Sequence, residues 1–477
     1  MPPTEPRLSP IERFLRLFTD IRAGEGGTAL LLFANVFLIL CSYYFIKPLR
    51  EGWIAVSGVA GLEKMEVRAY SSFAQSLLLV GVIAWYSGLV NRWPRARLIA
   101  AATLFCMSNM LVFWFLQPDF FVANLPVTGI VFYLWVGMFG VFVVAQFWAF
   151  AADVYTDAVG RRLMPLVAIG ATAGAAFGAQ ITSFLVDGGL VRVLERLDLT
   201  ALAELARHYL RTESLLMLAL VPLGVSIWIT QRVDRHPAHA PPAQPAARDG
   251  RGGLELVLRN RFLLAVALVT VLLNWVNTNG ENLLFRVVQE TLTEQAARAG
   301  VAGEEALVAF RRDGTTAFYG NFYTWVNVVA LLLQAVVASR LLKYGGFGAI
   351  LLMLPVVALT SYAAMALVPV LAVVKVMKVA ENATDYSINN TARHVVWLPV
   401  PSDVKFKGKP TVDTLFARVG DGFAALTILL GVQWLALATQ VFFAFNVALV
   451  LVWLVLSVAV TRGHKRLVES AAGNAAG

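Results

Sequence analysis

Twelve long apolar stretches alternate with short polar segments along the chain, six before a polar linker and six after it. A membrane-spanning helix needs about 20 mostly apolar residues. The pattern therefore predicts an all-α membrane protein with twelve transmembrane helices in two six-helix bundles. The predicted spans are 27–51, 69–91, 97–117, 127–151, 163–186, 212–231, 262–287, 316–339, 347–368, 370–394, 415–437 and 441–461.

The segment between the two sets of spans is rich in proline, alanine and glycine, and reads HPAHAPPAQPAARDGRGG over residues 236–253. Such a composition is typical of a flexible connector. We therefore expect an N-terminal bundle over 1–231, a linker over 232–261 and a C-terminal bundle over 262–477.

Composition agrees with a lipid environment and excludes a large soluble domain. Hydrophobic residues make up 58% of the 477 positions and charged residues 14%, whereas soluble domains carry about 25% charge. The net charge of +9 comes from basic residues in every second loop, as expected for cytoplasmic loops. We expect both termini and the linker to be cytoplasmic, and the basic loops to contact lipid rather than nucleic acid.

Short basic turns follow the second span of each half, GLVNRWPRARL at 88–98 and ASRLLKYGGFGAI at 338–350. Both are weakly similar to a loop motif of the major facilitator superfamily, and they indicate two related bundles. The stretch GATAGAAFGA at 170–179 has small residues four apart. That spacing is typical of close helix packing in a membrane.

Ionisable side chains inside spans are the main functional clues, because each costs several kcal/mol unless it pairs or faces a cavity. In span 1, Lys47, Arg50 and Glu51 share a helix face by their spacing, and Pro48 predicts a kink. Lys47 and Arg50 are candidate anion contacts. The alternative is that the span ends here and Lys47 reaches the outer interface.

Span 7 reads NWVNTNGENLLFR and carries Glu281 among polar neighbours. Asparagine and glycine suit a broken helix whose free backbone groups line a cavity. We therefore expect such a break here; the alternative is a polar helix end at the interface. The neighbours are Asn274, Asn277, Asn279 and Gly280.

Span 10 carries polar side chains at intervals of three and four, which predicts one polar stripe along the helix. A lipid-facing helix does not carry such a stripe. The alternative is an internal seam in which Lys378 pairs with Glu381. The stripe consists of Lys375, Lys378, Asn382, Asp385 and Asn389. At the start of span 11, Arg418 and Asp421 are three residues apart and suit a gate or a structural pair.

Motifs of other function classes are missing from the sequence. There is no G-x-x-x-x-G-K-[ST] loop, and the five histidines have no metal-binding spacing. Cys41 and Cys106 lie in apolar spans and are interpreted as packing residues. We expect no catalytic residue, metal or cofactor, and no enzyme activity.

Three segments together resemble the nucleotide translocase family, the ATP/ADP exchangers of plastids and intracellular bacteria, which are similar to the major facilitator superfamily. The resemblance implies exchange of ATP for ADP. It implies that Lys47 and Arg50 are the family's basic pair in span 1, that Glu281 is its span-7 glutamate, and that Arg418 replaces a lysine. The segments are IKPLREGWIAV at 46–56, AQFWAFAADVYTDAVGRRLMPLVAIGATAG at 145–174 and DYSINNTARHVVWLPVPSDVKFKGKPTVDTLFARVGDG at 385–422.

Other positions depart from the family pattern. Residues 136–140 contain no carboxylate where the family has a glutamate. Asp385 stands where the family has lysine, Asn390 where it has aspartate, and His394 where it has glutamate. These changes leave open a different anionic substrate.

We therefore expect a secondary transporter in the bacterial inner membrane. We expect it to carry a small anionic solute, a nucleotide that it exchanges as ATP for ADP, by alternating access. Alternatives are proton-coupled transport of another organic anion, a channel, and a lipid flippase or scramblase. The expected substrate-binding residues are Lys47, Arg50, Lys375, Lys378, Asn279 and Asn382, and the expected coupling or gating residues are Glu281, Asp385, Arg418 and Asp421.

Overall fold

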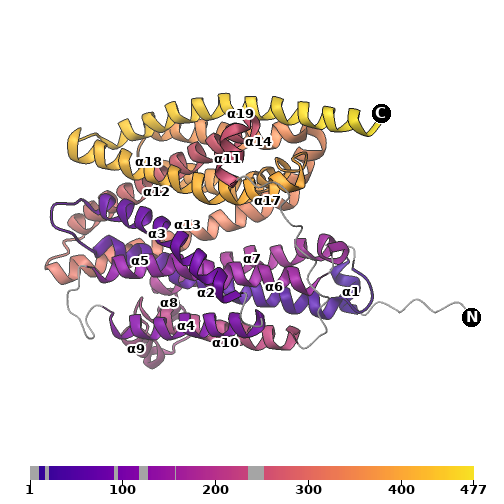
Figure 1. Ribbon diagram of the computed structural model, residues 1–477. Helices are drawn as coiled ribbons and strands as arrows, with labels where there is room; N and C mark the ends of the chain where they lie inside the picture. The colour runs from indigo at the N-terminus through magenta and orange to yellow at the C-terminus, as the bar shows by residue number, and fades with distance from the viewer. Residues whose placement is uncertain are drawn as a thin grey trace, which may run out of the picture. The chain divides into compact units, whose positions relative to one another are not determined.

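The computed structural model describes residues 10–16, 21–90, 95–117, 127–155, 157–234 and 252–476. Most of the predicted linker, 235–251, lies outside them. In the described ranges every regular element is a helix (Figure 1). The elements are α1 (Pro10–Leu15), α2 (Gly26–Val56), α3 (Lys64–Val90), α4 (Arg95–Phe115), α5 (Thr128–Phe139), η1 (Gly140–Ala145), α6 (Gln146–Val154), α7 (Asp157–Val186), α8 (Gly189–Arg196), α9 (Thr200–Tyr209), α10 (Ser214–Asp234), α11 (Gly253–Arg259), α12 (Arg261–Arg298), α13 (Glu304–Leu332), η2 (Leu333–Ala338), α14 (Ser339–Leu367), α15 (Leu371–Thr384), η3 (Asp385–Asn389), α16 (Asn390–Val395), α17 (Ser402–Thr411), η4 (Val412–Phe416), α18 (Ala417–Leu429), η5 (Leu430–Trp434) and α19 (Thr439–Ala476). The elements labelled η are π-helical.

All twelve predicted spans coincide with helices. Within the described ranges, nine stretches are long and apolar enough to cross a bilayer, and one of them, Glu304–Leu367, covers two predicted spans. The other two predicted spans coincide with α3 and with α15 to α16. The span formed by α15 to α16 carries several ionisable side chains, which lower its hydropathy.

A single backbone break separates the two spans inside Glu304–Leu367. Gly346 has φ 68° and ψ −169°, a conformation that glycine adopts without steric cost. The break falls in the predicted basic turn at 338–350. Apolar runs on both sides therefore form two helices rather than one.

Two compact units make up the structure. The first contains Met1–Trp53, Gly81–Pro242 and Arg312–Val328, and the second contains Ile54–Val80, Ala243–Arg311 and Val329–Gly477. This grouping follows packing, so neither unit is continuous in sequence. The division at 1–231, 232–261 and 262–477 stays a prediction.

Each unit has its own packed interior. In the first unit, the rings of Trp53, Phe113 and Phe132 form an aromatic core, with centroids 4.6 Å apart for Trp53 and Phe132 and 5.0 Å for Phe113 and Phe132. In the second unit, α12 packs against α18 and α19, and α14 lies beside α19 (Figure 1).

Small residues bring α7 close to α2 in the first unit. A Cβ at Gly170 would lie 2.7 Å from the Phe33 carbonyl oxygen, and a Cβ at Gly174 would collide with the Phe37 backbone. The helix-packing surface predicted from GATAGAAFGA is therefore confirmed at this contact.

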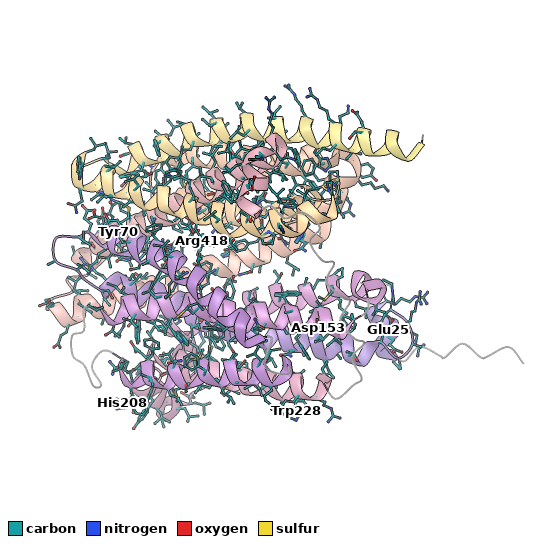
Figure 2. All side chains as sticks on the ribbon, viewed as in Figure 1. Glu25, Tyr70, Asp153, His208, Trp228 and Arg418 are labelled. Atoms are coloured by element: carbon teal, nitrogen blue, oxygen red, sulfur yellow. The ribbon has the colours of Figure 1, made fainter. Side chains whose placement is uncertain are left out.

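An ion pair ties the N-terminal end of α2 to α7. Arg162 donates two hydrogen bonds to Glu25, at 2.7 and 3.1 Å (Glu25 is labelled in Figure 2). Burial raises the pKa of Glu25, but the bonds from Arg162 and from the Arg22 backbone outweigh it, so this pKa lies below its ordinary value of 4.5. The charged form of Glu25 therefore stabilises the folded state.

We expect Gly174→Ala to lower the free energy of unfolding by about 1–3 kcal/mol, because the added methyl group has no space against the α2 backbone. The measurement is the unfolding midpoint of the purified protein in detergent. Gly224→Ala on α10 is the matched control, since nothing lies within 4 Å of a Cβ there. Equal midpoints for the two variants would show that α2 and α7 do not pack this closely.

We expect Glu25→Gln to lower the free energy of unfolding by about 1 kcal/mol at pH 7. A lowered folded-state pKa gives stability that is present above the unfolded value of 4.5 and is lost as the pH falls through the folded value. The difference between wild type and variant should therefore vanish on acidification below pH 4.5. A difference that persists unchanged in acid would contradict a role for the Glu25 charge.

Candidate functional site

Lys47 lies well inside a continuous helix. Helix α2 runs on to Val56, so the span does not end at Lys47. The Lys47 Nζ lies 4.0 Å from the ring centroid of Tyr323, 5.0 Å from that of Tyr44 and 5.9 Å from that of Tyr43. Ring faces attract a cation by about 2 kcal/mol when water is excluded. Three tyrosines thus hold this half-buried ammonium in the first unit.

Arg50 is neutralised by its neighbour in sequence. Its Nε lies 3.1 Å from Glu51 Oε1 and its second guanidinium nitrogen 2.5 Å from the same oxygen. Arg50 is 8% exposed and Glu51 fully buried. The guanidinium also lies 4.3 Å from the Tyr133 ring centroid. An anion that contacts Arg50 must therefore compete with Glu51.

The second unit contains a separate ionic network around Lys378, which is fully buried. Its ammonium lies 2.8 Å from Glu381 Oε2, 3.3 Å from Asn277 Oδ1 and 3.8 Å from Glu281 Oε1. The structure therefore contains the Lys378–Glu381 ion pair that was the alternative interpretation of the polar residues in span 10. The full charges on both side chains are compensated inside the protein.

Glu281 connects this pair to a residue that sequence reasoning missed. Asn382 donates to Glu281 Oε1 at 2.7 Å, and Arg68 lies 3.8 Å from Glu281 Oε2. Arg68 is 3% exposed and donates to Asn282 Oδ1 at 2.6 Å. It lies one residue before predicted span 69–91, so a slightly earlier boundary would have placed it among the buried charges.

The predicted break in span 7 is wrong: α12 is one continuous helix over 38 residues. Its polar side chains bond to neighbouring helices instead of replacing backbone hydrogen bonds. Asn279 donates to Asn446 Oδ1 on α19 at 3.2 Å. A Cβ at Gly280 would collide with the Tyr362 hydroxyl and lie 2.9 Å from Lys378 Nζ. Glycine is therefore needed for space, not for an unwound backbone.

The predicted single stripe of span 10 is also wrong in part, because the π-helical segment η3 interrupts the helix at Asp385. A π turn adds a residue and shifts the helical register. Asp385 accepts hydrogen bonds from Asn389 at 2.6 Å and Arg393 at 3.0 Å. Lys375 is half-buried on α15. The structure brings Lys378, Asn382 and Glu281 together, but Asp385 has a different set of partners.

Arg418 and Asp421 form the pair expected at the start of span 11 (Arg418 is labelled in Figure 2), with Nη1 and Oδ2 2.8 Å apart. Ser76 on α3 accepts from Arg418 and donates to Asp421, each at 2.8 Å. Thr278 on α12 donates to the other Asp421 oxygen, also at 2.8 Å. The pair therefore joins α18 to α3 and α12 in the second unit.

Solved structures of transporters have the same fold. A variant of the nucleoside transporter NupG matches with a TM-score of 0.57 at 12% identity, over 91% of this chain and 99% of that chain. The human organic anion transporter MFSD10 matches with a TM-score of 0.56 at 15% identity, over 91% and 100%. A bacterial homolog of the human lysosomal transporter Spinster matches with a TM-score of 0.52 at 14% identity, over 92% and 97%. The predicted fold class is confirmed.

Sequence comparison identifies the family. A search of curated protein sequences gives no significant match. The family model described as TLC ATP/ADP transporter matches residues 127–464, which is more than two thirds of the chain. The protein is therefore a multi-pass membrane transporter with a fold of the major facilitator type, and the chain belongs to the TLC ATP/ADP transporter family.

Proposed function

We propose that the protein exchanges anionic nucleotides, ATP for ADP, across the bacterial inner membrane by alternating access, with both termini cytoplasmic. The observation that carries the proposal is the family match over residues 127–464. Cations at membrane depth support it. Lys47 and Arg50 are the proposed contacts in the first unit, and Lys375, Lys378, Asn279 and Asn382 those in the second.

The ionic network of the second unit supplies a physical basis for exchange. Its two cations, Arg68 and Lys378, face two carboxylates, Glu281 and Glu381. An anion that binds either cation must displace a carboxylate. Glu281 is the one held at 3.8 Å by both cations, and its side chain is 18% exposed. We propose that Glu281 is displaced by substrate and re-pairs when the substrate leaves, so that empty and loaded carriers differ in energy.

Asp385, Arg418 and Asp421 are proposed gating residues. Each is held by a local ion pair, Arg393–Asp385 or Arg418–Asp421. The Arg418–Asp421 pair joins three helices through Ser76 and Thr278. A movement of α18 relative to α3 or α12 would therefore have to break these bonds.

A second candidate is proton-coupled transport of another organic anion. The departures from the family pattern at Asp385, Asn390 and His394 favour it, because they change charge on span 10. Under this candidate a displaced carboxylate takes up a proton instead of re-pairing with a cation.

We expect labelled ATP or ADP to enter proteoliposomes only when unlabelled nucleotide is inside. Lys47→Ala and Glu281→Ala should reduce the initial rate roughly ten- to hundredfold, as loss of a charge-assisted contact implies. Lys343→Ala, at an exposed position, is the control and should exchange like wild type. Uptake driven by a proton gradient into vesicles without nucleotide would support the second candidate. Absence of nucleotide uptake by folded protein would overturn the exchange proposal.

We expect Lys378→Met to lower the free energy of unfolding by about 3–5 kcal/mol, because it leaves Glu381 charged and buried. Adding Glu381→Gln should recover part of this loss, which gives a coupling energy of about 0.5–3 kcal/mol in a double-mutant cycle. The measurement is denaturation in detergent, with Lys375→Met as the half-buried control. Additive effects of the two changes would argue against direct pairing.

A further inference from the structure

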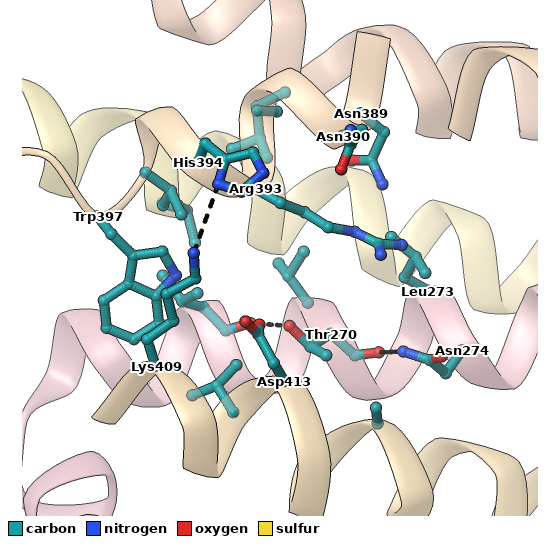
Figure 3. Close-up of a pocket in the computed structure, with 18 of the residues that line it drawn as sticks. Thr270, Leu273, Asn274, Asn389, Asn390, Arg393, His394, Trp397, Lys409 and Asp413 are labelled. Atoms are coloured by element: carbon teal, nitrogen blue, oxygen red, sulfur yellow. Dashed lines mark hydrogen bonds between the residues drawn. The ribbon is translucent and has the colours of Figure 1, made fainter. Parts of the chain in front are cut away.

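A cavity of about 320 Å³ lies in the second unit (Figure 3). Its lining comes from α12, α14, η3, α16, α17, η4, α18 and α19 and from the segment after α16. Small-molecule sites begin at about 300 Å³. No member of the buried ionic network lines this cavity. Of the residues expected from the sequence to bind or gate, Arg418 is on its wall. The cavity is therefore a separate feature from the network.

The charged side chains of the wall favour an anion. Three cations, Arg393, Lys409 and Arg418, line the cavity against one carboxylate, Asp413, with His394 beside them (Figure 3). Two of these cations have carboxylate partners that do not line the cavity, Arg393 with Asp385 and Arg418 with Asp421. Guanidinium and ammonium groups that can exchange a carboxylate partner for another oxyanion suit a phosphate.

Lys409 is the cation best placed for a ligand. Arg393 pairs with Asp385 at 3.0 Å and Arg418 with Asp421 at 2.8 Å. Lys409 instead lies 3.4 Å from Nδ1 of His394, and among the described residues no carboxylate is within 4 Å of its ammonium. Its charge is therefore compensated less than that of the two arginines.

Neutral groups complete the wall. Thr270, Asn274 and Asn390 contribute hydroxyl and amide groups, and Trp397, which is 3% exposed, contributes a planar apolar face (Figure 3). Thr270 and Asn274 already donate to backbone carbonyls of α12, at 3.0 and 2.8 Å, so the second amide N–H of Asn274 and the amide of Asn390 are the neutral donors for a ligand. The tryptophan face suits a less polar part of a phosphate-bearing molecule.

We propose that this cavity binds a phosphate group, with Lys409 and Arg393 as its cationic contacts. The phosphate belongs either to a free solute or to a lipid headgroup, which present the same chemistry to the wall. Asp413 repels the anion and limits its affinity. The proposal concerns binding and does not rest on nucleotide exchange.

The test is titration of the purified full chain with inorganic phosphate by calorimetry, in an uncharged detergent. Lys409→Gln should weaken binding about tenfold or more. Lys405→Gln, on the same helix but off the wall, is the matched control and should bind like wild type. Asp413→Asn should tighten binding, a direction that loss of folding does not produce.

A second arm identifies the source of the phosphate. The wild-type protein in nanodiscs of neutral lipid should still bind inorganic phosphate. If anionic headgroups occupy the cavity, the wild-type protein in nanodiscs of phosphatidylglycerol should not bind it. Phosphate binding in both kinds of nanodisc supports a free solute.

Three outcomes would overturn the proposal. The first is absence of phosphate binding by folded protein in detergent and in neutral nanodiscs. The second is an equal effect of Lys409→Gln and Lys405→Gln. The third is binding that is lost in Lys47→Ala but unchanged in Lys409→Gln, which would place the phosphate in the first unit.

Discussion

A charge that water does not reach has to be compensated by the protein, and the Lys378–Glu381 pair meets this requirement in the second unit. Breaking one partner of such a pair costs about 3–5 kcal/mol, more than most single contacts contribute. Around the pair, Asn277 accepts from Lys378 and Tyr362 donates to Glu381 at 3.0 Å. The side chains of α12, α14 and α15 are thus positioned by the need to satisfy two buried ions.

The same requirement explains residues whose role is otherwise obscure. Gly280 leaves the space that the Tyr362 hydroxyl and the Lys378 ammonium occupy. Arg68 supplies a second cation, which balances Glu281. Lys47 in the first unit lies against the faces of tyrosines, which attract a cation.

Apolar periodicity and local spacing were sufficient for the helices and for short-range pairs. The twelve spans follow from runs of apolar residues, and the Lys378–Glu381 and Arg418–Asp421 pairs follow from a spacing of three on a helix. Contacts between segments that are distant in the sequence could not be predicted. Arg68 reaches Asn282 across 214 positions, and no local pattern indicates that partner.

Two predictions were incorrect, for different reasons. Asparagine and glycine in span 7 were interpreted as signs of an unwound backbone, because the neighbouring helices that satisfy them were unknown. The register of span 10 was assumed to be purely α-helical. The π-helical segment η3 moves Asp385 to a different set of partners, and π segments have no simple sequence signature.

Asp385 and His394, two of the positions at which the resemblance implies a departure, each have a local partner. Asp385 is paired with Arg393 on the adjoining helix, and His394 lies beside Lys409. Neither residue belongs to the network that holds Glu281, and His394 instead lines the cavity. Lys47 and Glu281, at which the resemblance implies an unchanged charge, have their own partners in a tyrosine cluster and an ionic network. Changes at Asp385 and His394 therefore alter the surroundings of the cavity without removing a charge from either cluster. The charge changes that favour the proton-coupled candidate therefore lie outside the two clusters that contain Lys47 and Glu281.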